Sequence, residues 1–111
     1  MEHPNSPDPA NLIATIEKIA NAYYHRAVLQ EYELDDIPEA LANFGKAIKL
    51  NPQFAGAYYS WAVLRQTKLD DQFGSVIDFQ AAATFYRQQG RLKDWEDTIE
   101  LLKSLNIIFK L

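Results

Sequence analysis

The sequence repeats itself at a spacing of 35 residues, and this repeat limits the chain to a small set of folds. Eleven of the 26 positions from 22 to 47 are identical to those from 57 to 82, without a gap. The identity is densest where Ala22–Leu29 aligns with Ala57–Leu64. A period between about 20 and 50 residues is typical of stacked units, none of which can bury its apolar face alone. The chain is therefore expected to be an array of stacked supersecondary units.

Helix starts and ends can be placed from capping residues and prolines. Apolar side chains recur at spacings of three and four residues, which predicts helices, and no segment alternates for long enough to be a strand. Asp8-Pro9 is typical of a helix start, as is Asp36 with Glu39, where each side chain can cap the other's amide. Asn51-Pro52 predicts the end of one helix and the cap and first residue of the next. Gly90 is placed to end the fourth helix. We expect helices over about 9–34, 37–50, 52–68, 71–89 and 93–106.

Small residues mark where the paired helices must approach each other closely. Ala27 in the first helix of the pair, and Ala40 and Ala47 in the second, leave space that a large side chain would occupy. Phe44 supplies a large apolar group between the two small residues of the second helix. The second copy repeats this pattern with Ala62, Ser75, Phe79 and Ala82.

These residues resemble the tetratricopeptide repeat, a family of paired helices with a period of about 34 residues. Its pattern is an aromatic and a small residue in helix A, then small, aromatic and small residues in helix B, then a proline. The first unit matches at Tyr23, Ala27, Ala40, Phe44, Ala47 and Pro52, and the second at Tyr58, Ala62, Ser75, Phe79 and Ala82. The second unit has Arg87 in place of the closing proline, and the extra residue of each unit falls in the turn between its helices.

The resemblance implies an all-α fold, an α–α superhelix of about five helices. We expect a mobile arm over 1–8 and a single domain over 9–111, with units at about 20–54 and 55–90. The segment 93–106 is then the capping helix that such arrays need at their end.

The resemblance also implies a binding site, because the inner face of each helix A lines a concave groove in this family. The positions that fall on this face are Asn21, Tyr24, His25, Val28, Tyr32, Gly56, Tyr59, Ser60, Val63 and Gln66. Their tyrosines and valines suit an apolar or mixed peptide, since tyrosine combines a large contact area with a polar tip. The alternative is that one or two of these tyrosines belong to the core.

Some relatives hold the C-terminal carboxylate of chaperones with Lys, Asn and Arg on successive A helices. Tyr24, Val28 and Ser60 occupy the matching positions here, so this clamp is absent. His25 and Arg65 are expected near the groove, without forming a basic ring.

Composition argues against several other classes of function. The 111 residues carry 11 basic and 15 acidic side chains, and the net charge of −4 argues against nucleic acid, which needs a basic stripe. No apolar run approaches the roughly 20 residues of a membrane span. The first residues lack the basic and apolar blocks of a signal peptide, so a cytoplasmic location is expected.

No residue pattern indicates catalysis, a metal or a cofactor. The chain has no cysteine, and its two histidines, His3 and His25, are isolated, whereas zinc needs three or four convergent ligands. The pairs Asp35-Asp36 and Asp70-Asp71 recur at helix turns, where capping explains them. We therefore expect a protein that is not an enzyme and that has a protein or peptide partner.

The last residues, Ile107–Leu111, are unusually apolar for a chain end. They either fold over the final helix as core or form an interface. The preferred function is a protein-interaction module, a scaffold or assembly factor, that holds a partner peptide or helix in the groove. The alternative is a structural protein that dimerises, through this apolar terminus, to complete its solenoid.

Overall fold

Five helices make up the described part of the chain. The computed structural model describes the backbone of residues 8–109 and the side chains of residues 8–105. The helices are α1 (Pro9–Tyr32), α2 (Ile37–Leu50), α3 (Ala55–Thr67), α4 (Gln72–Gln88) and α5 (Leu92–Phe109). No strand occurs within 8–109, which confirms the predicted all-α class.

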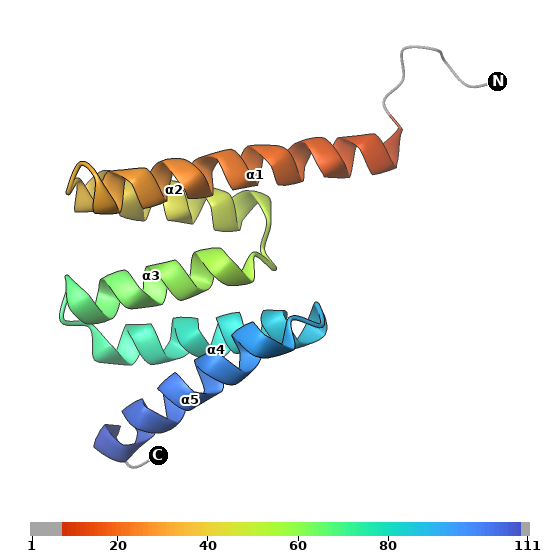
Figure 1. Ribbon diagram of the computed structural model, residues 1–111. Coiled ribbons are helices and arrows are strands. Elements are labelled where there is room, and N and C mark those ends of the chain that lie inside the picture. Colours follow the sequence, from red (N-terminus) through yellow and green to blue (C-terminus); the bar gives the residue numbers. More distant parts are fainter. Residues whose placement is uncertain (1–7, 110–111) are drawn as a thin grey trace.

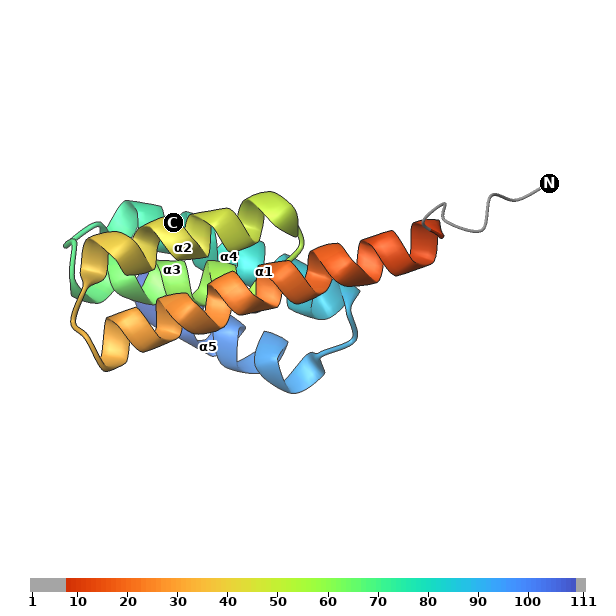
Figure 2. The same cartoon turned by 90° about the horizontal axis from the view of Figure 1, so that it is seen from above.

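The helices form a stack of two hairpins followed by a fifth helix, from α1 at the top to α5 at the bottom of Figure 1. The pair α1 and α2 is antiparallel, α3 and α4 repeat this arrangement, and α5 crosses α4 obliquely at the other end of the stack. Seen from above, the N-terminal part of α1 extends well beyond the other helices (Figure 2). This is the α–α superhelix that the repeat predicts.

Alanine and phenylalanine build the core at equivalent places in both units. One cluster contains Ala27, Ala40, Phe44 and Leu64, all with no exposed surface, and joins α1, α2 and α3. The next cluster joins α3, α4 and α5 through Ala62, Val76, Phe79, Ala83, Leu102 and Leu105. Each cluster spans three consecutive helices, so the core is continuous along the stack.

The two A-to-B turns have the same structure. Asp35 and Asp70 adopt left-handed backbone angles, with φ of 49° and 52°, which Asp tolerates better than most residues. The next residue caps the following helix, since the Asp36 and Asp71 carboxylates accept from the amides of Glu39 and Gly74. The reciprocal cap predicted for Asp36 and Glu39 is wrong, because the Asp36 amide donates to the Gln30 carbonyl instead.

The start of α3 also differs from its prediction. Asn51 and Pro52 do not begin this helix; they belong to a turn that ends at Phe54, and the helix begins at Ala55. The Phe54 amide donates to the Asn51 carbonyl, and the Tyr58 hydroxyl donates to the Pro52 carbonyl. These hydrogen bonds use the turn's own carbonyl groups, so the helical pattern starts later.

The other helix ends are close to their predictions. Asp8 caps α1 as expected, and Gly90 follows the C-cap of α4 with a φ of 73°. The first helix ends at Tyr32 rather than Leu34, because the left-handed turn follows, and the fifth extends to Phe109 rather than 106. Most of the predicted arm, residues 1–7, lies outside the described residues, as do the side chains of the apolar terminus from Asn106 onward.

Two glycines provide a matched test of the backbone. Gly45 lies within α2, where an added methyl group meets nothing within 4 Å, whereas Gly90 has a left-handed φ. We expect Gly45→Ala to raise the free energy of unfolding by about 0.5–1 kcal/mol. Gly90→Ala should lower it by about 1–2 kcal/mol, because an L side chain is strained there. Urea denaturation followed by circular dichroism measures both, and equal effects of the same sign would contradict the assigned turn.

Candidate functional site

Apart from Gly56, which has no side chain, the predicted groove positions comprise nine residues, which lie on two helices. Asn21, Tyr24, His25, Val28 and Tyr32 belong to α1, and Tyr59, Ser60, Val63 and Gln66 belong to α3. We call these nine residues the α1–α3 face. The two helices meet at the Tyr24 hydroxyl, which lies 3.5 Å from the hydroxyl oxygen of Ser60. Asn21, His25 and Tyr32 are exposed, and the other six are half-buried.

Tyr24 is held by aromatic rings beneath it. Its ring centre lies 5.7 Å from that of Phe44 and 5.0 Å from that of Phe54, and His25 meets its edge at 5.4 Å. A methyl group at Gly56 would lie 3.7 Å from the Tyr24 hydroxyl oxygen, so a small residue suits the space in front of this group. The position of Tyr24 is therefore fixed by packing before any partner binds.

Tyr59 repeats this arrangement in the second unit. Its ring meets the fully buried Phe79 edge to face at 5.2 Å. Val28 and Val63, one turn farther along their helices, pack against the same two core clusters. The two tyrosines and two valines thus contribute to the core and still keep part of their surface exposed.

Tyr32 and Tyr86 extend this group of tyrosines. Tyr32 is 71% exposed, and the neighbouring Glu31 carboxylate raises its pKa, with partial burial and the nearby Tyr24 and Tyr59 adding to the effect. Burial raises the pKa of Tyr86 to about 12, and Tyr24 and Tyr59 again contribute. The hydroxyl groups of Tyr32 and Tyr86 therefore stay protonated at neutral pH and can donate hydrogen bonds.

Tyr86 and Glu31 were not among the predicted site residues. Tyr86 lies on α4, outside the A helices to which the family pattern points. Glu31 lies on α1 between predicted positions, and burial raises the pKa of its carboxyl group while Lys68 opposes this shift. The alignment of the two copies offers no signal for either residue, because position 31 pairs with Gln66 and Tyr86 lies outside the aligned stretch.

Three hollows lie on other parts of the surface. The one between α4 and α5 has a volume of about 520 Å³ and is lined by Ala83, Trp95, Ile99 and Leu102, together with polar side chains. Two others, of about 390 Å³ and 210 Å³, lie along α1, the smaller of them also lined by Leu50 and Asn51. None of the three is lined by a residue of the α1–α3 face.

The sequence model of the TPR repeat family matches residues 29–67, which span the end of α1, all of α2 and all of α3. This match agrees with the two helical hairpins and with the repeat spacing. Residues 29–67 thus match a tetratricopeptide repeat, and the five-helix fold fits a protein of this family. TPR units generally mediate contacts between proteins and are generally not catalytic. Neither the curated proteins nor the solved structures contain a significant match.

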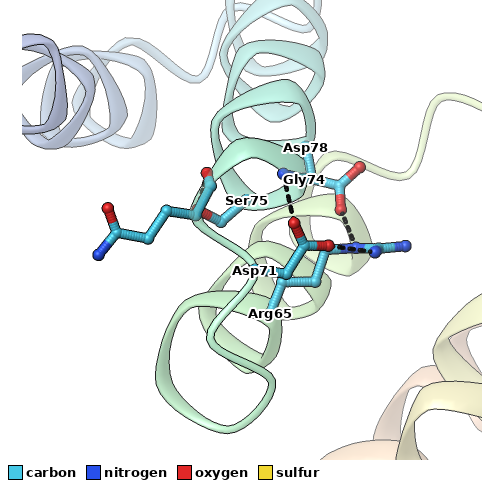
Figure 3. Close-up of polar contacts among 6 residues, drawn as sticks. Arg65, Asp71, Gly74, Ser75 and Asp78 are labelled. Atoms are coloured by element: carbon cyan, nitrogen blue, oxygen red, sulfur yellow. Dashed lines mark hydrogen bonds and ion pairs between the residues drawn. The ribbon is translucent and has the colours of Figure 1, made fainter. Parts of the chain in front are cut away.

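The charge of Arg65, which was expected near the groove, is paired within the second unit. Its guanidinium Nε lies 2.8 Å from Asp78 and its Nη1 lies 3.0 Å from Asp71, both on the α4 side (Figure 3). The same group stacks over the Trp61 ring at 4.9 Å. The two carboxylates of the second unit therefore hold the charge of Arg65.

The described residues contain neither a metal site nor a membrane-spanning helix. In residues 8–109 no three His, Asp or Glu side chains gather closely enough to hold a metal ion. None of the helices in this range combines the length and apolar character needed to cross a membrane.

The ion pairs of Arg65 predict a specific response to acid. Asp71 accepts hydrogen bonds from the Gly74 amide and from Arg65, and these bonds hold the pKa of its carboxyl group below the ordinary 3.8. Ionised Asp71 therefore stabilises the fold above that pH, and this contribution is lost on acidification. Burial raises the pKa of Asp78, although Arg65 opposes this shift. Asp78 therefore affects stability in the opposite direction: its contribution is present at low pH and is lost as the pH rises.

We therefore expect the melting temperature of Asp71→Asn to fall less steeply than that of the wild type between about pH 5 and pH 2. Asn preserves the helix cap, so the difference reports the charge. The melting temperature of Asp78→Asn should fall more steeply than that of the wild type over the same pH range. Thermal denaturation across this pH range measures both slopes, and slopes that change together would contradict these opposite assignments.

Proposed function

We propose that this TPR protein is a non-catalytic interaction module that holds a peptide or helix of a partner protein on the α1–α3 face. The supporting observation is the pairing of equivalent residues from both units on one surface, joined where the Tyr24 hydroxyl meets Ser60. Tyrosines fixed by packing bind with little loss of conformational entropy, which favours them as contact residues.

The chemistry of the face limits the partner. None of the nine residues is Asp, Glu, Lys or Arg, so the face offers phenol, amide and hydroxyl groups together with valine side chains. Arg65, which directly precedes Gln66 in the sequence, is held by Asp71 and Asp78. These groups suit an apolar or mixed segment and give no site for an acidic carboxylate tail. A scaffold or assembly role agrees with such a surface.

Exposure decides which residue tests this proposal best. Tyr24, Val28, Tyr59 and Val63 pack against the core clusters, so replacing them would lower stability as well as binding. Tyr32 is 71% exposed and belongs to the face, and Phe73 on α4, outside the face, is 74% exposed. These two aromatic residues therefore form a matched pair.

The experiment begins with peptides selected on the wild-type protein from a random displayed library. We expect Tyr32→Ala to weaken binding of the selected peptide about tenfold or more, or about 1.4 kcal/mol, because a large aromatic contact is lost. Isothermal titration calorimetry measures the dissociation constant.

Phe73→Ala is the control and should leave the dissociation constant unchanged. Circular dichroism verifies that both variants keep the helical content of the wild type. Binding that survives Tyr32→Ala and is lost in Phe73→Ala would place the site elsewhere and overturn the proposal.

A further inference from the structure

The outer side of α1 carries a row of side chains that no other helix within residues 8–109 covers. α1 lies at one end of the stack, and the view from above shows it uncovered on this side (Figure 2). Ala27, on the side that packs against α2, has no exposed surface. The outer side instead presents six exposed residues, which we call the outer row: Leu12, Thr15, Ile19, Ala22, Arg26 and Leu29.

The outer row has the spacing of a helix that pairs with another helix. Its members are separated alternately by three and four residues, the pattern that keeps one seam of a helix facing a partner over several turns. Four of the six are apolar, and Leu12, Ile19 and Leu29 are between 44% and 56% exposed. Single exposed apolar residues are ordinary, whereas an aligned row about 25 Å long indicates a surface for another helix.

A hollow of about 390 Å³ lies along the middle of this row. It is lined by four members of the row and by one residue on either side of it: Thr15, Ile19, Ala22 and Arg26, with Lys18 and Tyr23. The small Ala22 side chain leaves room beside the larger Ile19 and Tyr23. A side chain of a partner helix can therefore enter between them.

The charged side chains around this hollow are all basic. Lys18 and Arg26 line it, and the Lys46 ammonium of α2 lies 5.5 Å from the centre of the Tyr23 ring. All three cations are exposed, and none forms an ion pair within residues 8–105. Glu17 is the only acidic residue of α1 along the row, and it lines a different hollow. In a chain with a net charge of −4, this surface is thus locally positive.

The positive charge selects among the possible occupants. A second α1 would bring only further positive charge to this surface, which opposes pairing of two copies through the row. Residues 1–7 contain a single acidic residue, Glu2, and a single large apolar residue, Met1, so they offer no apolar stripe. Helices that lie in bilayers are rich in Lys and Arg, whereas α1 has two cations. An acidic helix of another protein fits both the spacing and the charge.

We propose that the outer row of α1, with Lys18 and Lys46 beside it, binds an amphipathic helix of a partner protein whose apolar stripe is flanked by Asp and Glu. The partner's stripe covers Leu12, Ile19 and Leu29, and its carboxylates pair with the three cations. This surface contains none of the nine residues of the α1–α3 face. It is therefore a second docking site that does not depend on the function proposed above.

A displayed library of helical peptides about three heptads long tests this proposal. Leucine is fixed at positions a and d, and Glu, Lys and Gln are allowed equally at the flanking positions e and g. Selection on the full-length wild type should enrich Glu over Lys at these positions. Lys18→Glu and Arg26→Glu should each raise the dissociation constant of the selected peptide about tenfold or more, because repulsion replaces attraction. Isothermal titration calorimetry measures the constants, and circular dichroism verifies the helical content of each variant.

Two control variants match the charge and the apolar contact. Lys93→Glu makes the same change of net charge at an exposed lysine of α5 and should leave the dissociation constant unchanged. Ile19 and Ile77 are 44% and 51% exposed, on α1 and α4. Ile19→Ala should raise the constant about fivefold or more, since an apolar contact is lost, and Ile77→Ala should not. Tyr32→Ala should also have no effect, because Tyr32 belongs to the α1–α3 face.

Several outcomes would overturn the proposal. One is a selection that prefers Lys or shows no preference. Others are an affinity that the reversals at Lys18 and Arg26 do not lower, or that Lys93→Glu lowers equally. A selected peptide that only Tyr32→Ala weakens would place the binding on the α1–α3 face instead. Binding of the wild type to vesicles of phosphatidylcholine and phosphatidylserine that Lys18→Glu abolishes would assign the outer row to a membrane surface.

Discussion

The close approach of paired helices at alanine is the constraint on which the structure depends. Ala27 and Ala40 in the first unit have no exposed surface, and neither have Ala62 and Ser75 at the equivalent positions of the second. A larger side chain at any of them would separate helix A from helix B, since interiors pack without spare volume. Because both pairs are held in the same way, equivalent residues of α1 and α3, such as Tyr24 and Tyr59, reach one surface.

Those parts of the fold that depend on local chemistry were predictable from the sequence. Asp8 and Gly90 act within one turn of their own helix, so the residue type alone indicates the cap. The buried alanines were predictable because the repeat shows the same small residue twice. The start of α3 was not predictable, since Asn51-Pro52 also suits a turn, and the choice depends on the Tyr58 hydroxyl contacting the Pro52 carbonyl.

The candidate site was predictable only as far as the family pattern reaches. The pattern names positions on the A helices, and the structure places these on α1 and α3. It carries no information on which direction a long side chain takes. Arg65 illustrates this point, because its charge turns to Asp71 and Asp78 on α4. Tyr86 comes from a B helix, and only the three-dimensional arrangement places it near Tyr24 and Tyr59.

The fifth helix repeats a feature of the A helices of the two complete units. Thr98 is fully buried, like Ala27 and Ala62, and its hydroxyl donates to the Asp94 carbonyl, so a small, satisfied side chain again permits close helix contact. By this criterion α5 is built as a helix A. In the two complete units the B helix contributes Phe44 or Phe79 to the buried core. Within the described residues α5 has no such helix after it, and its Trp95 and Ile99 remain half-buried beside a hollow. Within the described residues α5 is therefore an A-type helix that no B helix covers.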